Sequence, residues 1–234
     1  MLMSKFGCLY IVAVPIGNFQ DITLRAVELL RTVDAVICEE LREGSTLLKK
    51  LGIQNELICL NEHNEEEQSI VLVQKLQNGQ SLALISDCGT PVFADPGYRL
   101  VELLVGVGIK VVPVPGPSSL MALLSVVDFK LEKFIYGGFL SREEDRRRQD
   151  LVRLRAAGMP VVLMDAPYRM GRLLEEVSHA FGENTWVILG CDLTLPSEMI
   201  YRGSAGDLAK RLAGKKAEFV LLIHPLTPHK TVRS

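Results

Sequence analysis

The chain has 234 residues, of which 48% are hydrophobic and 23% are charged, and its formal net charge at pH 7 is -2. This length suits one large α/β domain or two smaller ones, and the composition is that of a globular protein with enough apolar residues for a core. The small net charge excludes a protein that binds nucleic acid or anionic membrane through its overall charge, although a local patch on an RNA-modifying enzyme stays compatible with it.

The cysteines favour free thiols in a reducing compartment. Their number is odd, no pair has CxxC spacing, and most lie within apolar runs: Cys8, Cys38, Cys59, Cys88 and Cys191. A disulfide framework and a zinc site are therefore disfavoured. No apolar run approaches the roughly 18 residues of a transmembrane helix, and the N-terminal residues lead into a strand without a small-residue cleavage site. We expect a cytoplasmic protein without a metal, a membrane partner or a DNA partner.

Strand-like and helix-like segments alternate along the first half of the chain. Short apolar runs predict strands at residues 9–14, 35–38, 82–85 and 110–114. Helical spacing of apolar residues predicts helices at 22–32, 45–51, 67–76, 97–105 and 118–125, with Ser45 as the N-cap of the second. Strands that are regularly separated by helices indicate βαβ units and a mainly parallel sheet.

The same alternation restarts in the second half. It predicts strands at 134–139, 160–164, 185–190 and 219–223, and helices at 143–157, 170–181 and 204–212. We place a domain boundary within residues 127–133, which gives an N-terminal domain 1–127 and a C-terminal domain 128–234. The predicted fold class is α/β, with two α/β/α domains that have mainly parallel sheets and a possible cleft between them.

Polar loops follow six of the predicted strands at their carboxyl ends. These loops are residues 15–18, 39–42, 86–97, 115–119, 165–169 and 191–194. In open α/β sheets, ligands bind at this edge. The common phosphate-loop, nucleophile-elbow and zinc-helix motifs are absent from the sequence, so the loops themselves are the candidates for a ligand site.

The loop SDCGTPVFADPG, residues 86–97, is the most unusual of the six. Gly89 and Gly97 let backbone approach a ligand closely, and Asp87 and Asp95 offer acceptors for a hydroxyl or an amine. The alternative is a purely structural turn. Ser118 and Ser119, at a predicted helix N-terminus, likewise have two interpretations, anion binding or simple helix capping.

Taken in chain order, five stretches resemble the tetrapyrrole methylase superfamily, and more narrowly its ribosomal RNA small-subunit methyltransferase I branch. The similarity extends over residues 9–223. The stretches are PIGNFQDITLRA (15–26), CEELR (38–42), NEHNE (61–65), SDCGTPVFADPGYRLV (86–101) and VPGPSSLMALLS (114–125).

This resemblance implies a homodimer of two-domain subunits that bind S-adenosylmethionine in the cleft between the domains. It also implies methylation of the ribose 2′-hydroxyl of a cytidine in small-subunit (16S) rRNA. The implied cofactor-binding residues are Ile16, Asp87, Gly89, Thr90, Pro91, Ser118, Ser119 and Met164. The implied catalytic residues are Asn18, Arg25, Glu39 and Asp165, and the implied substrate-binding residues are Arg42 and Arg169. Glu39 and Asp165 are the candidates to accept the proton of the ribose hydroxyl, and each could equally orient the substrate.

Departures from the pattern of this branch gather in the loops of the substrate side. Tyr168 stands where the family has histidine, and Cys191 and Leu195 stand where it has basic residues. Two alternatives therefore stay open beside rRNA methylation. One is a methylase of another acceptor, either a small molecule or a different RNA, and the other is a non-catalytic homologue that binds the cofactor.

The stretch SREEDRRRQD, residues 141–150, carries a cluster of arginines with two interpretations. Glu143 with Arg147 and Glu144 with Arg148 are spaced for ion pairs on a solvated helix. The alternative is that the arginines contact RNA phosphates.

Overall fold

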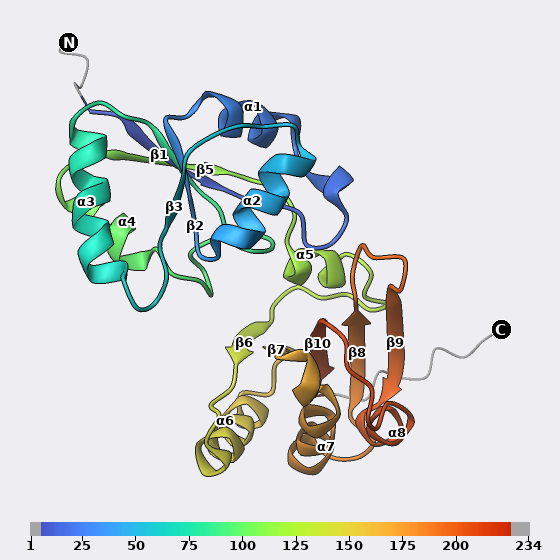
Figure 1. Ribbon diagram of the computed structural model, residues 1–234. Helices are drawn as coiled ribbons and strands as arrows, with labels where there is room; N and C mark the ends of the chain where they lie inside the picture. The colour runs from blue at the N-terminus through green and yellow to red at the C-terminus, as the bar shows by residue number, and fades with distance from the viewer. Residues whose placement is uncertain (1–5, 226–234) are drawn as a thin grey trace. The chain divides into compact units, whose positions relative to one another are not determined.

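A computed structural model describes residues 6–225 and divides the chain into two compact units, one ending at Ser118 and the other beginning at Ser119. Each unit contains a five-stranded sheet with helices packed on it (Figure 1), which confirms the α/β class. The division falls before the expected boundary at 127/128 because helix α5 (Ser119–Leu124) packs within the second unit. A Cβ placed on Gly190 would lie 2.9 Å from Leu123 Cδ1, and Arg202 donates to the carbonyl of Val126 at 2.6 Å.

The sheet of the first unit is entirely parallel. Its strands lie in the order β3-β2-β4-β1-β5, and every neighbouring pair runs parallel. The strands are β1 (Cys8–Val12), β2 (Ala35–Cys38), β3 (Leu57–Cys59), β4 (Leu82–Leu84) and β5 (Lys110–Val114). Their carboxyl ends therefore meet at one edge, as the βαβ alternation predicts.

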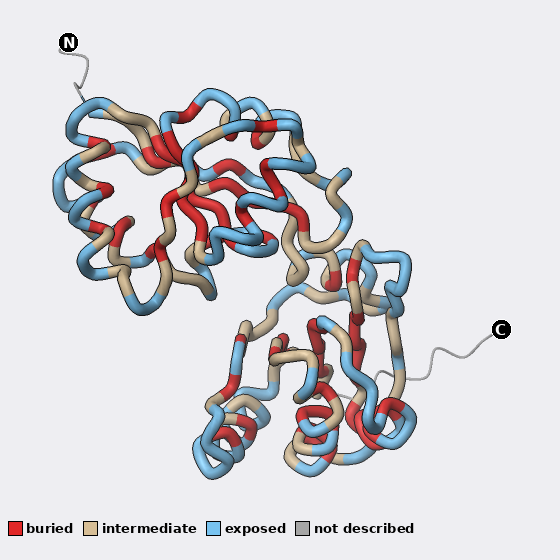
Figure 2. Tube along the Cα trace, viewed as in Figure 1, coloured by how far each residue is buried: buried red, intermediate tan, exposed pale blue. Residues whose placement is uncertain are grey.

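Helices cover both faces of this first sheet, with α1 and α2 on one side and α3 and α4 on the other (Figure 1). The helices are α1 (Leu24–Thr32), α2 (Leu41–Lys50), α3 (Glu65–Gln77) and α4 (Tyr98–Gly106). Strand β2 shows how both faces are buried. Val36 and Cys38 pack with α1 and α2, whereas Ala35 and Ile37 pack with α3 and α4. This double burial explains the continuous apolar runs of the strands, which Figure 2 shows as buried.

The sheet of the second unit is mixed. Its strands, in the order β6-β7-β10-β8-β9, are β6 (Ile135–Phe139), β7 (Val161–Asp165), β8 (Trp186–Cys191), β9 (Met199–Ser204) and β10 (Phe219–His224). Only β6 and β7 pair in parallel among these described strands, because β9 returns beside β8 without a helical crossover and β10 runs antiparallel between β7 and β8.

One face of this second sheet is covered by α6 (Glu144–Ala156), α7 (Met170–Phe181) and α8 (Ala205–Arg211). Leu151 of α6, Leu174 of α7 and Leu208 of α8 pack with residues of β7, β8 and β10 in one hydrophobic core. Two short 3-10 helices, Phe19–Asp21 and Pro167–Arg169, follow strands at the loops described below. Within residues 6–225, no helix combines the length and the apolarity needed to span a bilayer.

The start of α2 differs from the sequence prediction. The helix begins at Leu41, so the expectation that Ser45 is its N-cap is wrong, and Ser45 lies inside the helix. Gly44 lets the first turn of the helix pack directly on strand β2. A Cβ at this position would lie only 2.7 Å from Cys38 Sγ. Strands β3 and β9 were not predicted, since β3 has only three residues and β9 mixes apolar with polar residues.

The arginine cluster of α6 is divided between the core and the solvent. The Arg147 side chain is only 1% exposed and forms a two-pronged ion pair with Glu176 of α7, at 2.6 and 2.7 Å. The third nitrogen of its guanidinium group, Nη1, donates to the carbonyls of Ser141 and Arg142, both at 3.1 Å. Burial alone would raise the pKa of Glu176, but hydrogen bonds from Arg147 and Arg172 outweigh it and lower that pKa. Arg147 is therefore a structural residue that ties α6 to α7, and the expected pair of Glu143 with Arg147 is not formed.

We predict that Arg147→Met lowers the free energy of unfolding by about 3 kcal/mol, because it leaves the partly buried Glu176 with only one of its two arginine partners. The matched control is Arg148→Gln, which removes an exposed arginine that pairs with Glu144 at 3.5 Å. Exposed pairs of this kind contribute about 0.5 kcal/mol. Urea denaturation of the two variants gives the comparison, and equal losses would contradict the structural role of Arg147.

Candidate functional site

The loops that follow β1 and β4 are joined by backbone hydrogen bonds at the carboxyl edge of the first sheet. The amide of Val14 donates to the carbonyl of Gly89 at 2.8 Å, and the amide of Gly89 donates back to Val14 at 3.2 Å. The Thr90 hydroxyl donates to the carbonyl of Pro117 in the loop after β5, at 3.3 Å. Three of the predicted ligand loops thus meet at one place within the first unit.

Gly89 has a conformation and a setting that suit a close backbone approach. Its φ of +80° lies in the left-handed region, and a Cβ at this position would lie 3.3 Å from Ile16 Cγ2. A larger residue would be strained in the backbone and crowded against the first loop. The absence of a side chain at Gly89 therefore lets the Ile16 side chain lie close to its backbone.

A hollow of about 160 Å³ opens beside these loops. It is lined from the first loop by Pro15, Ile16, Gly17 and Phe19, from the loop after β4 by Ser86, Asp87 and Cys88, and from α2 by Glu43 and Thr46. Pockets that enclose a whole small molecule usually measure about 300–1,000 Å³. The hollow by itself therefore suits only part of a ligand the size of a nucleoside cofactor.

Three carboxyl groups at this edge have raised pKa values, each mainly because of burial. For Glu39, which directly follows β2, burial raises the pKa first, and the charges of Asp87 and Asp95 add to it. Burial also raises the pKa of Asp87, against a hydrogen bond that it accepts from the amide of Glu40 at 3.4 Å. Burial likewise raises the pKa of Asp95. Carboxylates held close together in this way favour a positively charged ligand.

The other residues predicted for the first unit lie at its surface. Arg25 of α1 and Arg42 of α2 are exposed, and Asn18 is exposed and accepts a hydrogen bond from the amide of Gln20 at 3.0 Å as the cap of the short helix Phe19–Asp21. Pro91 is buried, and Ser118 is half-buried just before Ser119, the first residue of α5.

The residues predicted for the second unit gather at the end of β7. Asp165 is 7% exposed, and its carboxylate accepts a hydrogen bond from the amide of Ala166 at 2.8 Å and pairs with Arg169 at 3.3 Å. The Tyr136 hydroxyl donates to Met164 Sδ at 3.4 Å. Asp165 and Arg169 are therefore engaged with each other, whereas the charges that act on Glu39 within residues 6–225 are those of other carboxylates.

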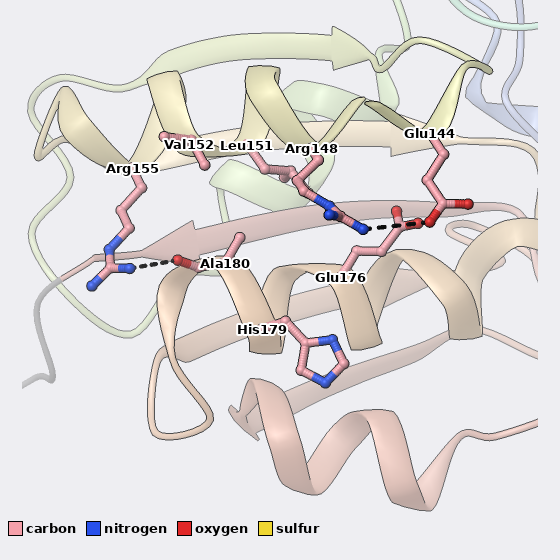
Figure 3. A pocket seen from close by; sticks show the side chains of 8 residues that line it. All are labelled: Glu144, Arg148, Leu151, Val152, Arg155, Glu176, His179 and Ala180. Carbon is pink, nitrogen blue, oxygen red and sulfur yellow. Dashed lines mark hydrogen bonds and ion pairs between the residues drawn. The ribbon is translucent and has the colours of Figure 1, made fainter. Parts of the chain in front are cut away.

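A second hollow lies between α6 and α7 and is lined by none of the predicted site residues. It measures about 520 Å³ and is lined by Glu144, Arg148, Leu151, Val152, Arg155, Glu176, His179 and Ala180 (Figure 3). Most of its charged groups are already paired, since Glu144 binds Arg148 and the Arg155 guanidinium donates to the carbonyl of Ala180 at 2.8 Å. This groove between helices is larger than the hollow at the sheet edge, but it lacks the strand-end loops.

The sequence prediction missed the contribution of α2 to the site. Glu43 and Thr46 line the hollow, but they fall at or before the helix start that the sequence predicted. The signal was available in the spacing of Gly44, Leu47 and Leu48, which form the buried face of α2.

All five cysteines lie among the described residues and are free, as expected. Burial, followed by the influence of Cys59 and nearby carboxylates, raises the pKa of Cys38 to about 12. Cys38 therefore stays a protonated thiol at neutral pH and is no candidate for a nucleophile.

We predict that Glu39→Gln raises the free energy of unfolding at neutral pH. Because the folded-state pKa of Glu39 is raised, the folded protein binds its proton more tightly than the unfolded chain, and stability falls as the pH rises from the ordinary glutamate value through the raised one. The amide of the variant does not ionise, so the variant avoids this loss of stability. The difference in free energy of unfolding between the variant and the parent protein should therefore vanish below about pH 4. Glu28→Gln, on the exposed side of α1, is the control. Thermal unfolding at several pH values measures both variants, and a pH-independent difference would contradict the prediction.

Comparison with known proteins places this site in a family. The profile of the tetrapyrrole (corrin/porphyrin) methylases matches residues 8–209. The protein named ribosomal RNA small subunit methyltransferase I in Escherichia coli O157:H7 is 38% identical over 221 residues, which cover 93% of this chain and 77% of that protein. The protein of the same name in Leptospira biflexa is 39% identical, with 93% and 91% covered.

Solved structures show the same fold at low identity. A cobalt precorrin-4 methyltransferase is 20% identical with a TM-score of 0.69, over 92% of this chain and 94% of that one. Diphthine synthase is 16% identical with a TM-score of 0.70, over 93% and 89%. Because the profile spans both α/β units and the curated relatives match nearly the whole chain, the chain belongs to the tetrapyrrole methylase family, in the branch of relatives named ribosomal RNA small subunit methyltransferase I.

Proposed function

We propose that the protein transfers the methyl group of S-adenosylmethionine to the ribose 2′-hydroxyl of a cytidine in small-subunit rRNA. The observation that carries this proposal is the 38–39% identity, over 93% of the chain, with curated relatives named ribosomal RNA small subunit methyltransferase I. The setting that we propose with it is a cytoplasmic homodimer that acts on the small ribosomal subunit.

The carboxylates at the edge of the first sheet suit the positive charge of S-adenosylmethionine, and the hollow beside them suits part of that ligand. When bound, this cofactor supplies an electrophilic methyl group on a positively charged sulfonium. The hollow lined by Ile16 and Asp87 admits part of a ligand, and the carboxylate of Asp87 offers an acceptor for a hydroxyl or a cationic amine. We assign cofactor contacts to Ile16 and to Asp87, Gly89, Thr90 and Pro91, and further contacts to Ser118, Ser119 and Met164.

Of the two candidates for the general base, the contacts favour Glu39. The carboxylate of Asp165 is buried and held by Arg169 and by the amide of Ala166, which suits a residue that orients its neighbours. Glu39 is half-buried, and its raised pKa makes it a stronger proton acceptor than an ordinary glutamate. We propose that Glu39 accepts the ribose hydroxyl proton while Asn18 and Arg25, with Arg42 and Arg169, position the acceptor.

The altered substrate-side positions support a second candidate, a methylase of a different acceptor. Cys191 is buried, with its Sγ 3.7 Å from the Sδ of Met170, so this position offers no charge to an RNA phosphate. Tyr168 and Leu195, by contrast, are exposed. A non-catalytic homologue that only binds the cofactor is the third alternative, and the assay below separates rRNA methylation from the other two.

Labelled S-adenosylmethionine and undermethylated small ribosomal subunits test the main proposal. We expect label at a cytidine ribose in the small-subunit rRNA. Cofactor binding by calorimetry without any transfer to subunits would leave the two alternatives, and the absence of binding would remove all three.

We predict that Glu39→Gln lowers kcat by about 10²–10⁴ in this assay, the usual contribution of a general base. The affinity for the cofactor should stay within about threefold, because the amide keeps the size of the side chain. Glu28→Gln again serves as the control and should keep full activity. An unchanged kcat in Glu39→Gln would exclude Glu39 as the base.

We predict that cofactor affinity falls as the pH is lowered through the raised pKa of Asp87. A cationic ligand binds best to ionised carboxylates, and a carboxyl with a raised pKa becomes protonated at a higher pH than an ordinary aspartate. Asp87→Asn should weaken binding about tenfold at about pH 7.5, and the difference should narrow towards about pH 5. Calorimetry across this range gives the measurement, and parallel curves for the two proteins would exclude a role for the Asp87 charge.

A further inference from the structure

The candidate base Glu39 lies where strand β2 passes into α2, between the loops that follow β3 and β4. On the β3 side, the amide of Leu60 donates to the carbonyl of Cys38 at 2.9 Å. On the β4 side, the amide of Ile85 donates to the carbonyl of Ile37, also at 2.9 Å. The backbone hydrogen bonds of the sheet thus extend to the end of β2 on both sides. Just beyond them, side chains from the two flanking loops contact the backbone after Glu39.

The peptide group that joins Glu39 to Glu40 is held from both sides. Its carbonyl accepts a hydrogen bond from the thiol of Cys59, the last residue of β3, at 3.2 Å. Its amide donates to the carboxylate of Asp87, in the loop after β4, at 3.4 Å. Because a peptide group is planar, these two bonds together fix the backbone that follows the Glu39 Cα. The direction in which the Glu39 side chain leaves the backbone is therefore set by its neighbours on both strands.

The thiol of Cys59 is oriented by Asn61. The side-chain amide of Asn61 donates to Cys59 Sγ at 3.3 Å, so the sulfur accepts this bond while its own proton is directed at the carbonyl of Glu39. The Asn61 side-chain oxygen accepts from the amides of His63 at 3.0 Å and Asn64 at 3.2 Å. Asn64 Nδ2 in turn donates to the carbonyl of Cys59 at 3.2 Å. The loop after β3 is thus closed onto the cysteine that holds the peptide group.

Glu39 needs such support because its electrostatic surroundings oppose its place at this edge. The charges that act on it are those of Asp87, Asp95, Glu62 and Glu40, all of its own sign. Repulsion favours conformations in which the ionised carboxylate turns away into solvent. A general base must lie within hydrogen-bond reach of the proton that it accepts, and a displacement of about 1 Å can lower the rate by about 10².

We propose that Cys59, oriented by Asn61, is a positioning residue that holds Glu39 where it accepts the proton of the ribose hydroxyl. This inference rests on the proposed function, in which Glu39 is the base, and it gives a role to a thiol that the proposed function does not use. The alternative is that the Cys59 thiol only closes the end of the sheet. Its removal would then act on the fold and not through Glu39.

A double-mutant cycle in the methylation assay with undermethylated small subunits separates these two roles. We expect Cys59→Ala to lower kcat about tenfold or more, because the base is less well placed. The KM values for subunits and S-adenosylmethionine should stay within about threefold. In a Glu39→Gln background the same substitution should lower kcat no further, since the group through which it acts is gone. Equal losses of kcat in the two backgrounds would overturn the inference.

Three further variants of the cysteines complete this test. Cys59→Ser keeps a hydroxyl donor and should restore most of kcat, so a loss as large as in Cys59→Ala would contradict the role of the hydrogen bond. Cys8→Ala is the matched control, because it removes a half-buried thiol at the opposite end of the same parallel sheet, and it should keep full kcat. Cys59→Val fills the space of the thiol without its donor, and it replaces Cys59→Ala if urea denaturation shows that the alanine variant is unfolded.

A titration tests the contact independently of methyl transfer. Carboxyl-carbon NMR of glutamate-labelled protein follows Glu39, whose signal is identified by its loss in Glu39→Gln. Burial first, and then the like charges, raises the pKa of Glu39 in the parent protein. If Cys59→Ala releases the side chain into solvent, this pKa should fall towards the ordinary glutamate value. Cys59→Ser and Cys8→Ala should keep the raised pKa, and an unchanged pKa in Cys59→Ala would overturn the positioning role.

The outcomes keep the two proposals apart. Methylation by the parent protein upholds the proposed function, even where additive losses of kcat or an unchanged pKa overturn the inference. An unchanged kcat in Glu39→Gln removes the base, and with it the inference, but leaves rRNA methylation standing. A parent protein that methylates no subunits overturns the proposed function. The titration then decides alone whether Cys59 holds Glu39 in place.

Discussion

The site depends on the central position of β4 in an all-parallel sheet. Because β4 pairs with β2 on one side and β1 on the other, the loops that leave these strands emerge side by side at one edge. The two hydrogen bonds between Val14 and Gly89 then join two of them directly. A helical crossover must follow every strand in such a sheet, so the loops have no room to separate. The hollow and the grouped carboxylates lie at this edge.

The same edge shows a conflict between stability and chemistry. Burial and neighbouring charges raise the pKa of Glu39, Asp87 and Asp95 together, so each ionised carboxylate destabilises the fold at neutral pH. The second unit uses its buried charge in the opposite way. There Arg147 and Glu176 form a paired bridge that holds two helices together and lowers the pKa of the carboxylate. Unpaired charge at one place and fully paired charge at the other distinguish a ligand-binding edge from a structural contact.

Much of the fold could be predicted from the sequence because its signals are local. The apolar runs of the buried strands and the spacing of α1, α4 and α7 predicted those elements to within one or two residues. The start of α2 was missed even though Gly44, Leu47 and Leu48 share its buried face, because the contact that Gly44 permits with Cys38 is known only once the helix is packed. Strand β9 was missed for a similar reason. Its six residues mix apolar with polar side chains, and its pairing with β8 is a tertiary contact that this local pattern does not predict.

The sequence by itself determined the family, the strand-end loops and the residue types that they carry, because motif and spacing are properties of the chain. Only the tertiary structure decided what those residues do to one another. It turned Arg147 from one of three similar arginines into a buried bridge, and it engaged Asp165 with Arg169 while leaving Glu39 among like charges. Burial and electrostatic coupling depend on distances between segments far apart in the chain, and no local pattern encodes those distances.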